Sequence, residues 1–222
     1  MQYLFALLSI MIFGGTAYLA IRFSQRVCAK VEPFADGPAP GQPPIMWMYA
    51  TTLLISVLSA RHMLSIGDHP NLPLLVEPFL KTVALGLLSA CLISAWYCDA
   101  RCGIVPDWCT VPATLLLLLM SLLGREWFVL IGALLLTAPF ALQAYRSKGL
   151  GMGWGDVKLV ALGGAFLGPL AFFTTTLSCI AMIVYAKITK RSHEPMAFAP
   201  YLVVGFEAGL GIMMTQNVLA PG

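Results

Sequence analysis

Charged residues are scarce in this chain. Only 10% of its 222 residues are Asp, Glu, Lys or Arg, whereas 59% are hydrophobic, and the mean hydropathy is strongly positive. A soluble globular domain carries about 25% charged residues, so this composition excludes one and indicates a polytopic membrane protein surrounded by lipid. The net charge of +3 is modest, and we expect no nucleic-acid partner.

The chain also lacks the residue spacings of a metal site. Its six cysteines include no C-x2-C pair, and its three histidines, His62, His69 and His193, lie far in sequence from the cysteines at 98, 102 and 109. Zinc sites and disulfide frameworks are recognised by regular spacings of such residues. We therefore predict no metal site, no disulfide framework and no cofactor.

Apolar runs of the length that crosses a bilayer fill most of the sequence. Such a span needs roughly 20 residues, and the runs predict an all-α transmembrane helix bundle of about eight spans, with seven as the alternative. The spans are expected near residues 3–22, 45–62, 74–98, 109–123, 127–145, 157–170, 171–189 and 197–215. We expect one integral-membrane domain over residues 1–222, since little sequence is left for a soluble domain. Gly163-Gly164 and Gly168-Pro169 interrupt the sixth run, and this leaves seven spans as the alternative count.

The distribution of basic residues predicts the orientation. With the N-terminus outside, the inner loops and helix ends hold ten Lys and Arg residues: Arg22, Arg26, Lys30, Arg101, Arg146, Lys148, Lys158, Lys187, Lys190 and Arg191. The outer side then holds only Arg61 and Arg125, which satisfies the positive-inside rule. In this orientation the inner face carries four segments: the Pro- and Gly-rich loop 23–44, residues 99–110, the glycine run 151–156 and residues 198–201.

Two aspartates lie at helix ends on this inner face. Asp99 follows Trp96-Tyr97-Cys98, and Asp156 closes the run that begins at Gly151. A carboxylate beside a bilayer is costly and marks a candidate functional site. Two nearby carboxyl groups cannot both ionise cheaply, so the pair can act as acid and base on one water molecule. The helix dipole opposes charge at the C-terminal position of Asp99 and favours it at the N-terminal position of Asp156, which predicts Asp99 as the protonated member.

Glycines precede the second aspartate at positions 151, 153 and 155. They would allow a positive φ or a close approach of the backbone to a substrate. A phosphate-binding loop would need Lys followed by Ser or Thr, which is absent here. Taken singly, Asp156 could be a helix N-cap and Asp99 a partner of Arg101; the presence of both aspartates on one face favours a catalytic pair.

Residues 153–159 (GWGDVKL) resemble the G-x-G-D-x-K-L motif of type IV prepilin peptidases, which are membrane aspartic proteases. Residues 99–110 (DARCGIVPDWCT) are similar to the other family signature, in which an aspartate at a helix end precedes Pro-Asp, one variable residue, a Leu-like residue and Thr. Residues 198–202 (FAPYL) resemble the Phe-Gly-Pro-Phe-Leu segment, and residues 14–22 are a weaker match to the first helix. Cys109 stands where the family has Leu.

The resemblance implies a function and a set of site residues. Asp99 and Asp156 would be catalytic, and the substrate-binding or loop residues would be Gly151, Gly153, Gly155, Asp107, Lys158 and Pro200. The substrates would be prepilins or pseudopilins, whose short basic leader is removed after a Gly. The enzyme would be a multi-pass protein of the bacterial inner membrane, with its active site facing the cytosol.

One departure from the family pattern concerns the loop 23–44. Many family members carry two C-x2-C pairs in a zinc-bearing cytosolic loop and also methylate the new N-terminus with S-adenosylmethionine. This loop contains only Cys28, and Ala20 replaces the family's Asn in the first helix. We therefore expect the loop to replace the methyltransferase domain, and peptidase activity without methylation.

Two other classes compete with this hypothesis. A polytopic transporter or a non-enzymatic assembly subunit could use the aspartates to bind ions or to end helices, but a transporter places its site near the midplane, within related halves. A protease of the signal-peptide-peptidase or presenilin kind would carry its first aspartate deeper in a helix. Oligomeric state and the identity of the pilin are not predicted.

Overall fold

The computed structural model describes residues 2–30, 72–148, 152–190 and 197–219, and isolated positions between 50 and 60. These residues form helices and no strand, in agreement with the predicted all-α fold. The helices are α1 (Gln2–Cys28), α3 (Leu72–Cys102), α4 (Asp107–Leu123), α5 (Trp127–Arg146), α6 (Trp154–Leu167), α7 (Leu170–Ile188) and α8 (Ala199–Leu219). Most of the expected span 45–62 and of the loop 23–44 lies outside the described residues.

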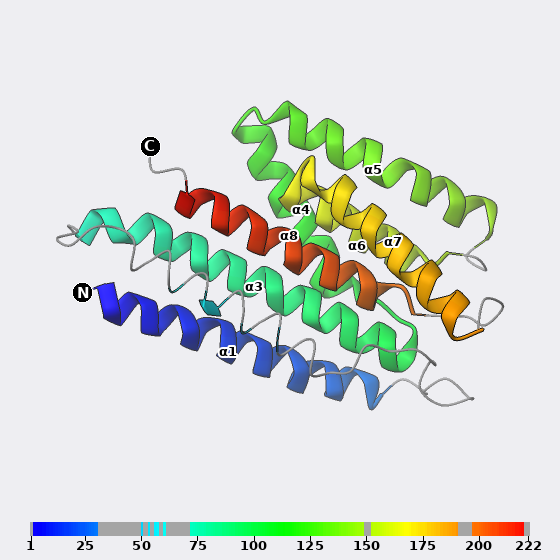
Figure 1. The fold of residues 1–222 in the computed structure, drawn as a ribbon, viewed down its shortest axis with the longest axis horizontal. Coiled ribbons are helices and arrows are strands. Elements are labelled where there is room, and N and C mark those ends of the chain that lie inside the picture. Colours follow the sequence, from blue (N-terminus) through cyan, green and yellow to red (C-terminus); the bar gives the residue numbers. More distant parts are fainter. Residues whose placement is uncertain are drawn as a thin grey trace.

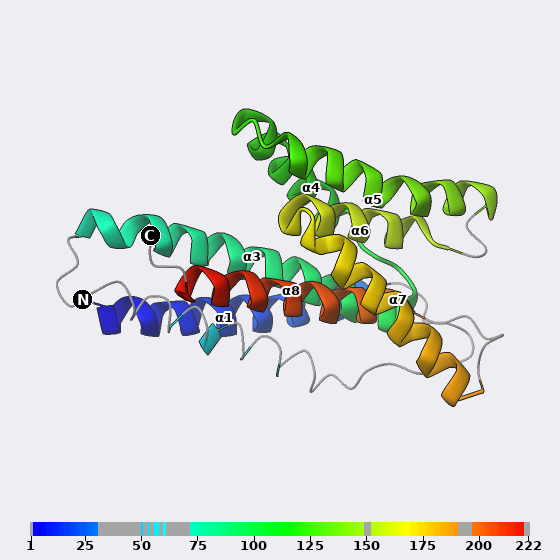
Figure 2. The ribbon, with the colours of Figure 1, turned by 45° about the horizontal axis from the view of Figure 1, so that its top comes forward.

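The helices form two groups that meet along α8 (Figures 1 and 2). Helices α1 and α3 lie side by side and run in the same direction, and α8 runs antiparallel to them. Helices α4, α5, α6 and α7 form the second group, in which α6 contacts the other three and also α8. Helix α3 ends, and α6 and α8 begin, toward the right-hand end of Figure 1, which we call the Asp99 end.

Among the described residues, four helices are long and apolar enough to cross a membrane. These segments are Ala6–Cys28, Thr82–Cys102, Trp127–Arg146 and Leu170–Ile188, and two shorter apolar helices occupy Asp107–Leu123 and Ala199–Met213. Many large apolar side chains on their outer faces are exposed, among them Leu134 on α5 and Phe173 on α7. Such a surface is stable in contact with lipid, so the protein is a membrane protein. The exact number of spans stays a prediction.

The glycine pair at 163 and 164 does not interrupt α6. A Cβ atom at Gly163 would lie 2.2 Å from the ring of Phe206, and one at Gly164 would lie 2.9 Å from the Cα of Ala133. These glycines therefore allow α6 to approach α8 and α5 closely, as small residues do in membrane bundles. The helix ends instead at Gly168, whose φ of 55° is readily adopted by glycine, and Pro169 follows it.

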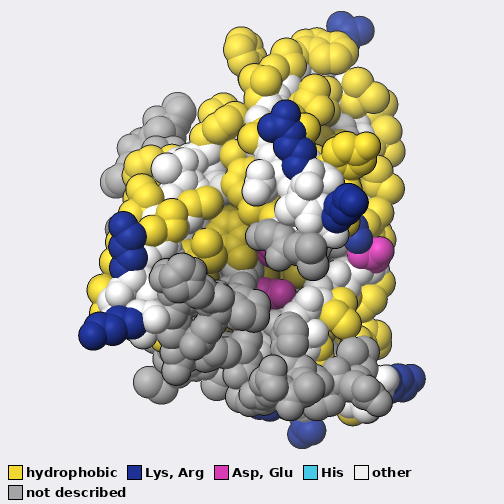
Figure 3. Space-filling view, turned by 90° about the vertical axis from the view of Figure 1, so that its right-hand side faces the viewer, with side chains coloured by type: hydrophobic (Ala, Val, Ile, Leu, Met, Phe, Trp, Pro, Cys, Tyr) yellow, Lys and Arg dark blue, Asp and Glu magenta, His cyan; other side chains and the backbone are white. Residues whose placement is uncertain are grey.

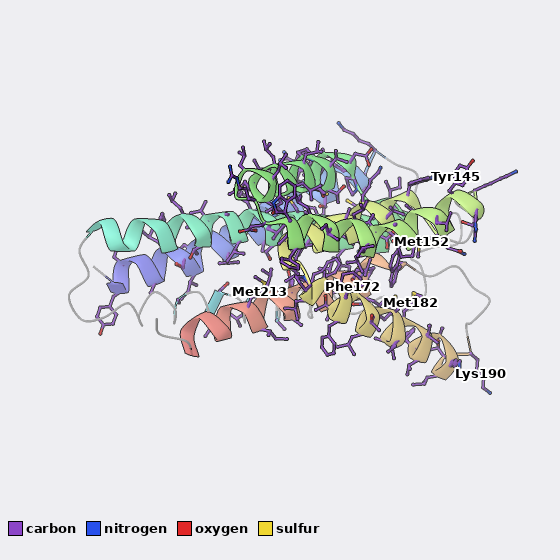
Figure 4. All side chains as sticks on the ribbon, turned by 90° about the horizontal axis from the view of Figure 1, so that it is seen from above. Tyr145, Met152, Phe172, Met182, Lys190 and Met213 are labelled. Carbon is purple, nitrogen blue, oxygen red and sulfur yellow. The ribbon has the colours of Figure 1, made fainter. Side chains whose placement is uncertain are left out.

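The core lies where the two groups meet. Its largest fully buried side chains include Phe13 of α1, Trp96 of α3, Leu159 of α6 and Phe206 of α8. Seen from above, Tyr145, Met152 and Lys190 lie toward one end of the molecule and Met213 toward the other (Figure 4). Met152 packs against the core just before α6 begins, so the segment that leads to Asp156 is anchored to the bundle.

Candidate active site

Asp99 lies near the C-terminal end of α3, as predicted, three residues before the helix ends at Cys102. Its side chain is only 7% exposed. The carboxylate oxygen Oδ2 accepts a hydrogen bond of 3.1 Å from the backbone N–H of Ala199. A buried carboxyl group needs such a partner, because burial without a hydrogen bond is strongly unfavourable.

The donor to Asp99 is supplied by the start of α8. Ala199 is the first residue of this helix, and the first N–H groups of a helix have no partner within the helix. Pro200 follows it and has no N–H, a residue well suited to the first turn. The partial positive charge of the helix N-terminus also favours a nearby carboxylate. Pro200 is buried in this turn, next in sequence to the residue that donates to Asp99.

Asp156 lies in the first turn of α6, also as predicted. Burial raises the pKa of Asp156 to about 6, and a hydrogen bond from the backbone of Gly153 opposes part of that effect. Its charge interacts with the carboxyl group of Asp99. The two aspartates, 57 positions apart in sequence, are thus brought to one site from opposite ends of two helices.

Gly155 makes a close approach within the protein. A Cβ atom at this position would lie 2.8 Å from the Cβ of Val105 and 3.4 Å from its backbone nitrogen. Val105 belongs to the short segment between α3 and α4, so Gly155 holds the start of α6 against that segment. Gly153 precedes the helix with φ of −75°, which any residue can adopt. The glycines at 153 and 155 therefore do not supply the positive φ that the sequence suggested.

Asp107 and Lys158 join the same two segments through an ion pair. Asp107 begins α4 and is 68% exposed on its side chain, and Lys158 in the second turn of α6 is 33% exposed. Cys109 and Thr110 donate hydrogen bonds back to the carbonyl of Pro106 and complete the first turn of α4. The structure therefore brings Asp107 and Lys158 together, and their ion pair connects the start of α4 to α6 two residues after Asp156.

The Asp99 end combines a basic periphery with acidic side chains near its centre (Figure 3). The described part of the chain contains no group of three His, Cys, Asp or Glu side chains that could hold a metal ion. Gly151 and all three histidines lie outside the described residues, so the prediction for Gly151 is not tested.

The geometry supports acid–base chemistry on a water molecule. Two interacting carboxyl groups in a partly buried site cannot both ionise cheaply, so the pair holds a proton over a wide range of pH. One member can then accept a proton while the other donates one, which is the requirement for hydrolysis by two aspartates.

One of the four segments expected on one face, residues 99–110, contacts the starts of two helices, α6 and α8. Residues 99–110 touch the α6 start through Val105 and Asp107, and the α8 start through Asp99. Sequence reasoning missed the Ala199 donor, although Pro200 was a usable signal, since a proline often marks the first turn of a helix, where backbone N–H groups have no partner within the helix. It also missed Val105, which carries no pattern of its own.

Comparison with known proteins gives a consistent result. Residues 86–187 match the type IV leader peptidase family. The chain is 28% identical over 166 residues to the prepilin leader peptidase/N-methyltransferase of Dichelobacter nodosus, 34% identical over 134 residues to that of Neisseria gonorrhoeae, and 30% identical over 145 residues to that of Aeromonas hydrophila.

These alignments cover 70%, 53% and 58% of this chain and 55%, 44% and 49% of the three relatives. The chain thus spans about half the length of the curated relatives it matches. No solved structure matches it.

Proposed function

We propose that this chain, whose residues 86–187 match the type IV leader peptidase family, is a member of that family and an aspartic endopeptidase that removes the short basic leader of type IV prepilins or pseudopilins. One observation carries the proposal. Asp99 and Asp156 lie at opposite helix ends, and tertiary structure brings their carboxyl groups into electrostatic contact at a partly buried site. Both aspartates fall inside the segment that matches the family.

In the proposed reaction Asp156 is the ionised member and Asp99 carries the proton. Asp156 accepts a proton from water as the water oxygen attacks the scissile carbonyl carbon, and Asp99 donates a proton to the substrate. Collapse of the tetrahedral intermediate breaks the C–N bond, and the leaving amine takes up a proton from the pair. The N–H of Ala199 then stabilises the negative charge that develops on Asp99.

The proposed setting is the bacterial inner membrane, with the Asp99 end in the cytosol. The excess of Lys and Arg residues on this side supports that orientation. A substrate with a basic leader and an apolar helix would place its cleavage site at the membrane surface, where the aspartates lie.

The decisive experiment compares leader removal by membranes that contain the wild-type chain, Asp99→Asn or Asp156→Asn. Each substitution keeps the shape of the side chain and removes its ability to exchange a proton. We expect each to lower the cleavage rate by about a thousandfold or more, as is typical of essential acid–base groups. Near-full cleavage by either variant, at normal levels of inserted protein, would remove that residue from the mechanism.

We further propose that processing leaves the new N-terminus unmethylated, although the relatives are named as peptidase/N-methyltransferases. The segment 23–44, whose first residues belong to α1 as far as Cys28, would replace a methyltransferase domain, since Cys28 is its only cysteine. The mass of the mature pilin tests this in cells where the chain is the sole candidate enzyme. An additional 14 Da (about one methyl group) would refute the proposal for methylation while leaving the one for cleavage intact.

A further inference from the structure

Glu207 is a buried carboxyl group that the proposed reaction does not use. It lies in α8, is 2% exposed, and accepts a hydrogen bond of 3.1 Å at Oε1 from the hydroxyl of Ser89 in α3, which is 1% exposed. A polar side chain within the bundle is expensive and is kept for structure or for function. This hydrogen bond joins two helices, unlike the bonds of hydroxyl groups that donate to a carbonyl of their own helix.

Helices α3 and α8 are therefore joined by hydrogen bonds at two levels. At the Asp99 end, Ala199 donates to Asp99, and deeper in the bundle Ser89 donates to Glu207. The two helices run antiparallel and side by side (Figures 1 and 2). Ser89 lies about 15 Å along α3 from Asp99, and Glu207 about 12 Å along α8 from Ala199, at about 1.5 Å per residue. The spacings agree to within the reach of a side chain, so the two contacts fix one register.

Two other contacts of α8 are made with α7 and do not act on α3 directly. Ser178 of α7 donates to the carbonyl of Tyr201 at 2.9 Å, and a Cβ at Gly205 would lie 2.3 Å from the Ser178 hydroxyl. These contacts fix α8 against α7, which carries neither aspartate. The interaction between Ser89 and Glu207 fixes α8 against the helix that carries Asp99.

From this arrangement we infer that Glu207 is a positioning residue: through Ser89 it holds α8 in the register at which the Ala199 N–H reaches the carboxylate of Asp99. The expected effect of Glu207 on catalysis rests on the proposed function. It requires that Glu207 act as a hydrogen-bond acceptor, so its charge is dispensable. A displacement of about 1 Å at a catalytic group can cost about a hundredfold in rate, which sets the scale of the expected effect.

The test uses the full chain in lipid nanodiscs with the substitutions Glu207→Leu, Glu207→Gln and Ser89→Ala. Thr137→Val is the matched control, because the Thr137 hydroxyl bonds within its own helix to the Ala133 carbonyl at 2.7 Å. Two quantities are measured: kcat and KM for a prepilin substrate, and the hydrogen-exchange rate of the Ala199 amide. We expect Glu207→Leu to lower kcat by about tenfold to a hundredfold with little change in KM, and to speed Ala199 exchange by about tenfold.

Glu207→Gln keeps the acceptor and should stay close to wild type on both measures, and Ser89→Ala should follow Glu207→Leu in direction. Ser89→Ala removes a single oxygen atom and keeps the test valid if Glu207→Leu fails to fold. Unchanged Ala199 exchange in Ser89→Ala, or a Glu207→Gln variant as impaired as Glu207→Leu, would overturn the inference. A wild-type chain that does not cleave prepilin would refute the proposed function alone, because the exchange rates would still decide the role of Glu207.

Discussion

Asp99 and Asp156 reach one site from opposite helix ends, and different parts of the protein hold them. Asp99 is almost fully buried at the end of a 31-residue helix and receives its hydrogen bond from α8, a distant element. Asp156 is partly exposed in the first turn of a 14-residue helix, and the backbone group that lowers its pKa belongs to Gly153, three residues earlier. One aspartate depends on tertiary packing and the other mainly on local structure, so changes in packing should affect the two unequally.

Lengthening each aspartate by one methylene tests this difference most strongly. Asp99→Glu inserts volume into a closed site at a cost of about 1–3 kcal/mol, and it displaces the carboxyl group from Ala199. We expect the cleavage rate to fall about a hundredfold or more, against about tenfold for Asp156→Glu at the more open site. The measurement is kcat for both variants at equal membrane levels. Equal losses of cleavage rate in the two variants would show that the position of Asp99 is no more sensitive to packing than that of Asp156.

Gly155→Ala should disturb Asp156 through the neighbouring segment. The new Cβ would lie 2.8 Å from the Cβ of Val105, which cannot swing away as a long side chain would. The start of α6 must then shift, and we expect about a tenfold loss of cleavage. Gly132→Ala is the control, because its Cβ would meet Phe172 at 3.9 Å, an ordinary contact. Wild-type activity in Gly155→Ala would show that this close approach does not position Asp156.

The pH dependence of cleavage should report the environment of Asp156. Burial raises the pKa of Asp156 from 3.8 to about 6, and the proposed mechanism needs this group ionised. We therefore expect kcat to fall by about tenfold per pH unit below pH 6, because each unit reduces the ionised fraction tenfold. An acid limb near pH 4 in a kcat profile would contradict the assignment of Asp156 as the base.

The raised pKa of Asp156 affects folding stability in the opposite direction from activity: its contribution to stability decreases as the pH rises. A folded state that binds the proton more tightly than the unfolded state is most stabilised, through this group, below about pH 4. That contribution is lost as the pH rises through about 6. The chain should therefore gain activity over the pH range in which Asp156 contributes less to stability. The measurement is the thermal unfolding temperature at pH 4 and pH 7 for the wild type and for Asp156→Asn as the reference.

The ion pair of Asp107 and Lys158 should have the smallest effect. Both side chains are partly solvated, so the pair contributes about 0–1 kcal/mol. We expect Lys158→Gln or Asp107→Asn to lower kcat/KM by about fivefold at most, with a smaller loss at high salt. Lys187→Gln, which changes a charge on α7, is the control. A loss as large as that of Asp156→Asn would assign one of the pair a direct role in the reaction.

The sequence was sufficient to locate both aspartates and the helix ends that carry them. Positive charge and hydrophobic runs predicted which segments share a face, and the structure brings Asp99 near Asp156 and Asp107 near Lys158. These features depend on local composition. By contrast, the partners of Asp99 and Glu207 lie 100 and 118 positions away, and their pairing depends on the register of packed helices, which no local pattern encodes.

The role of the glycines was harder to predict for a similar reason. A run of glycines before Asp156 suggested backbone flexibility for a substrate, whereas Gly155 makes room for Val105. Gly163 likewise suggested a break in the sixth span and instead accommodates the ring of Phe206. Sequence indicates that a side chain is absent, but only the packed structure identifies what occupies the space.

The shortness of α6 has a consequence for the surrounding lipid. Its 14 residues measure about 21 Å, less than the hydrocarbon thickness of about 30 Å. The helix is enclosed by α4, α5, α7 and α8, so its mismatch is absorbed by protein instead of by deformation of acyl chains. The protein should therefore tolerate bilayers of different thickness.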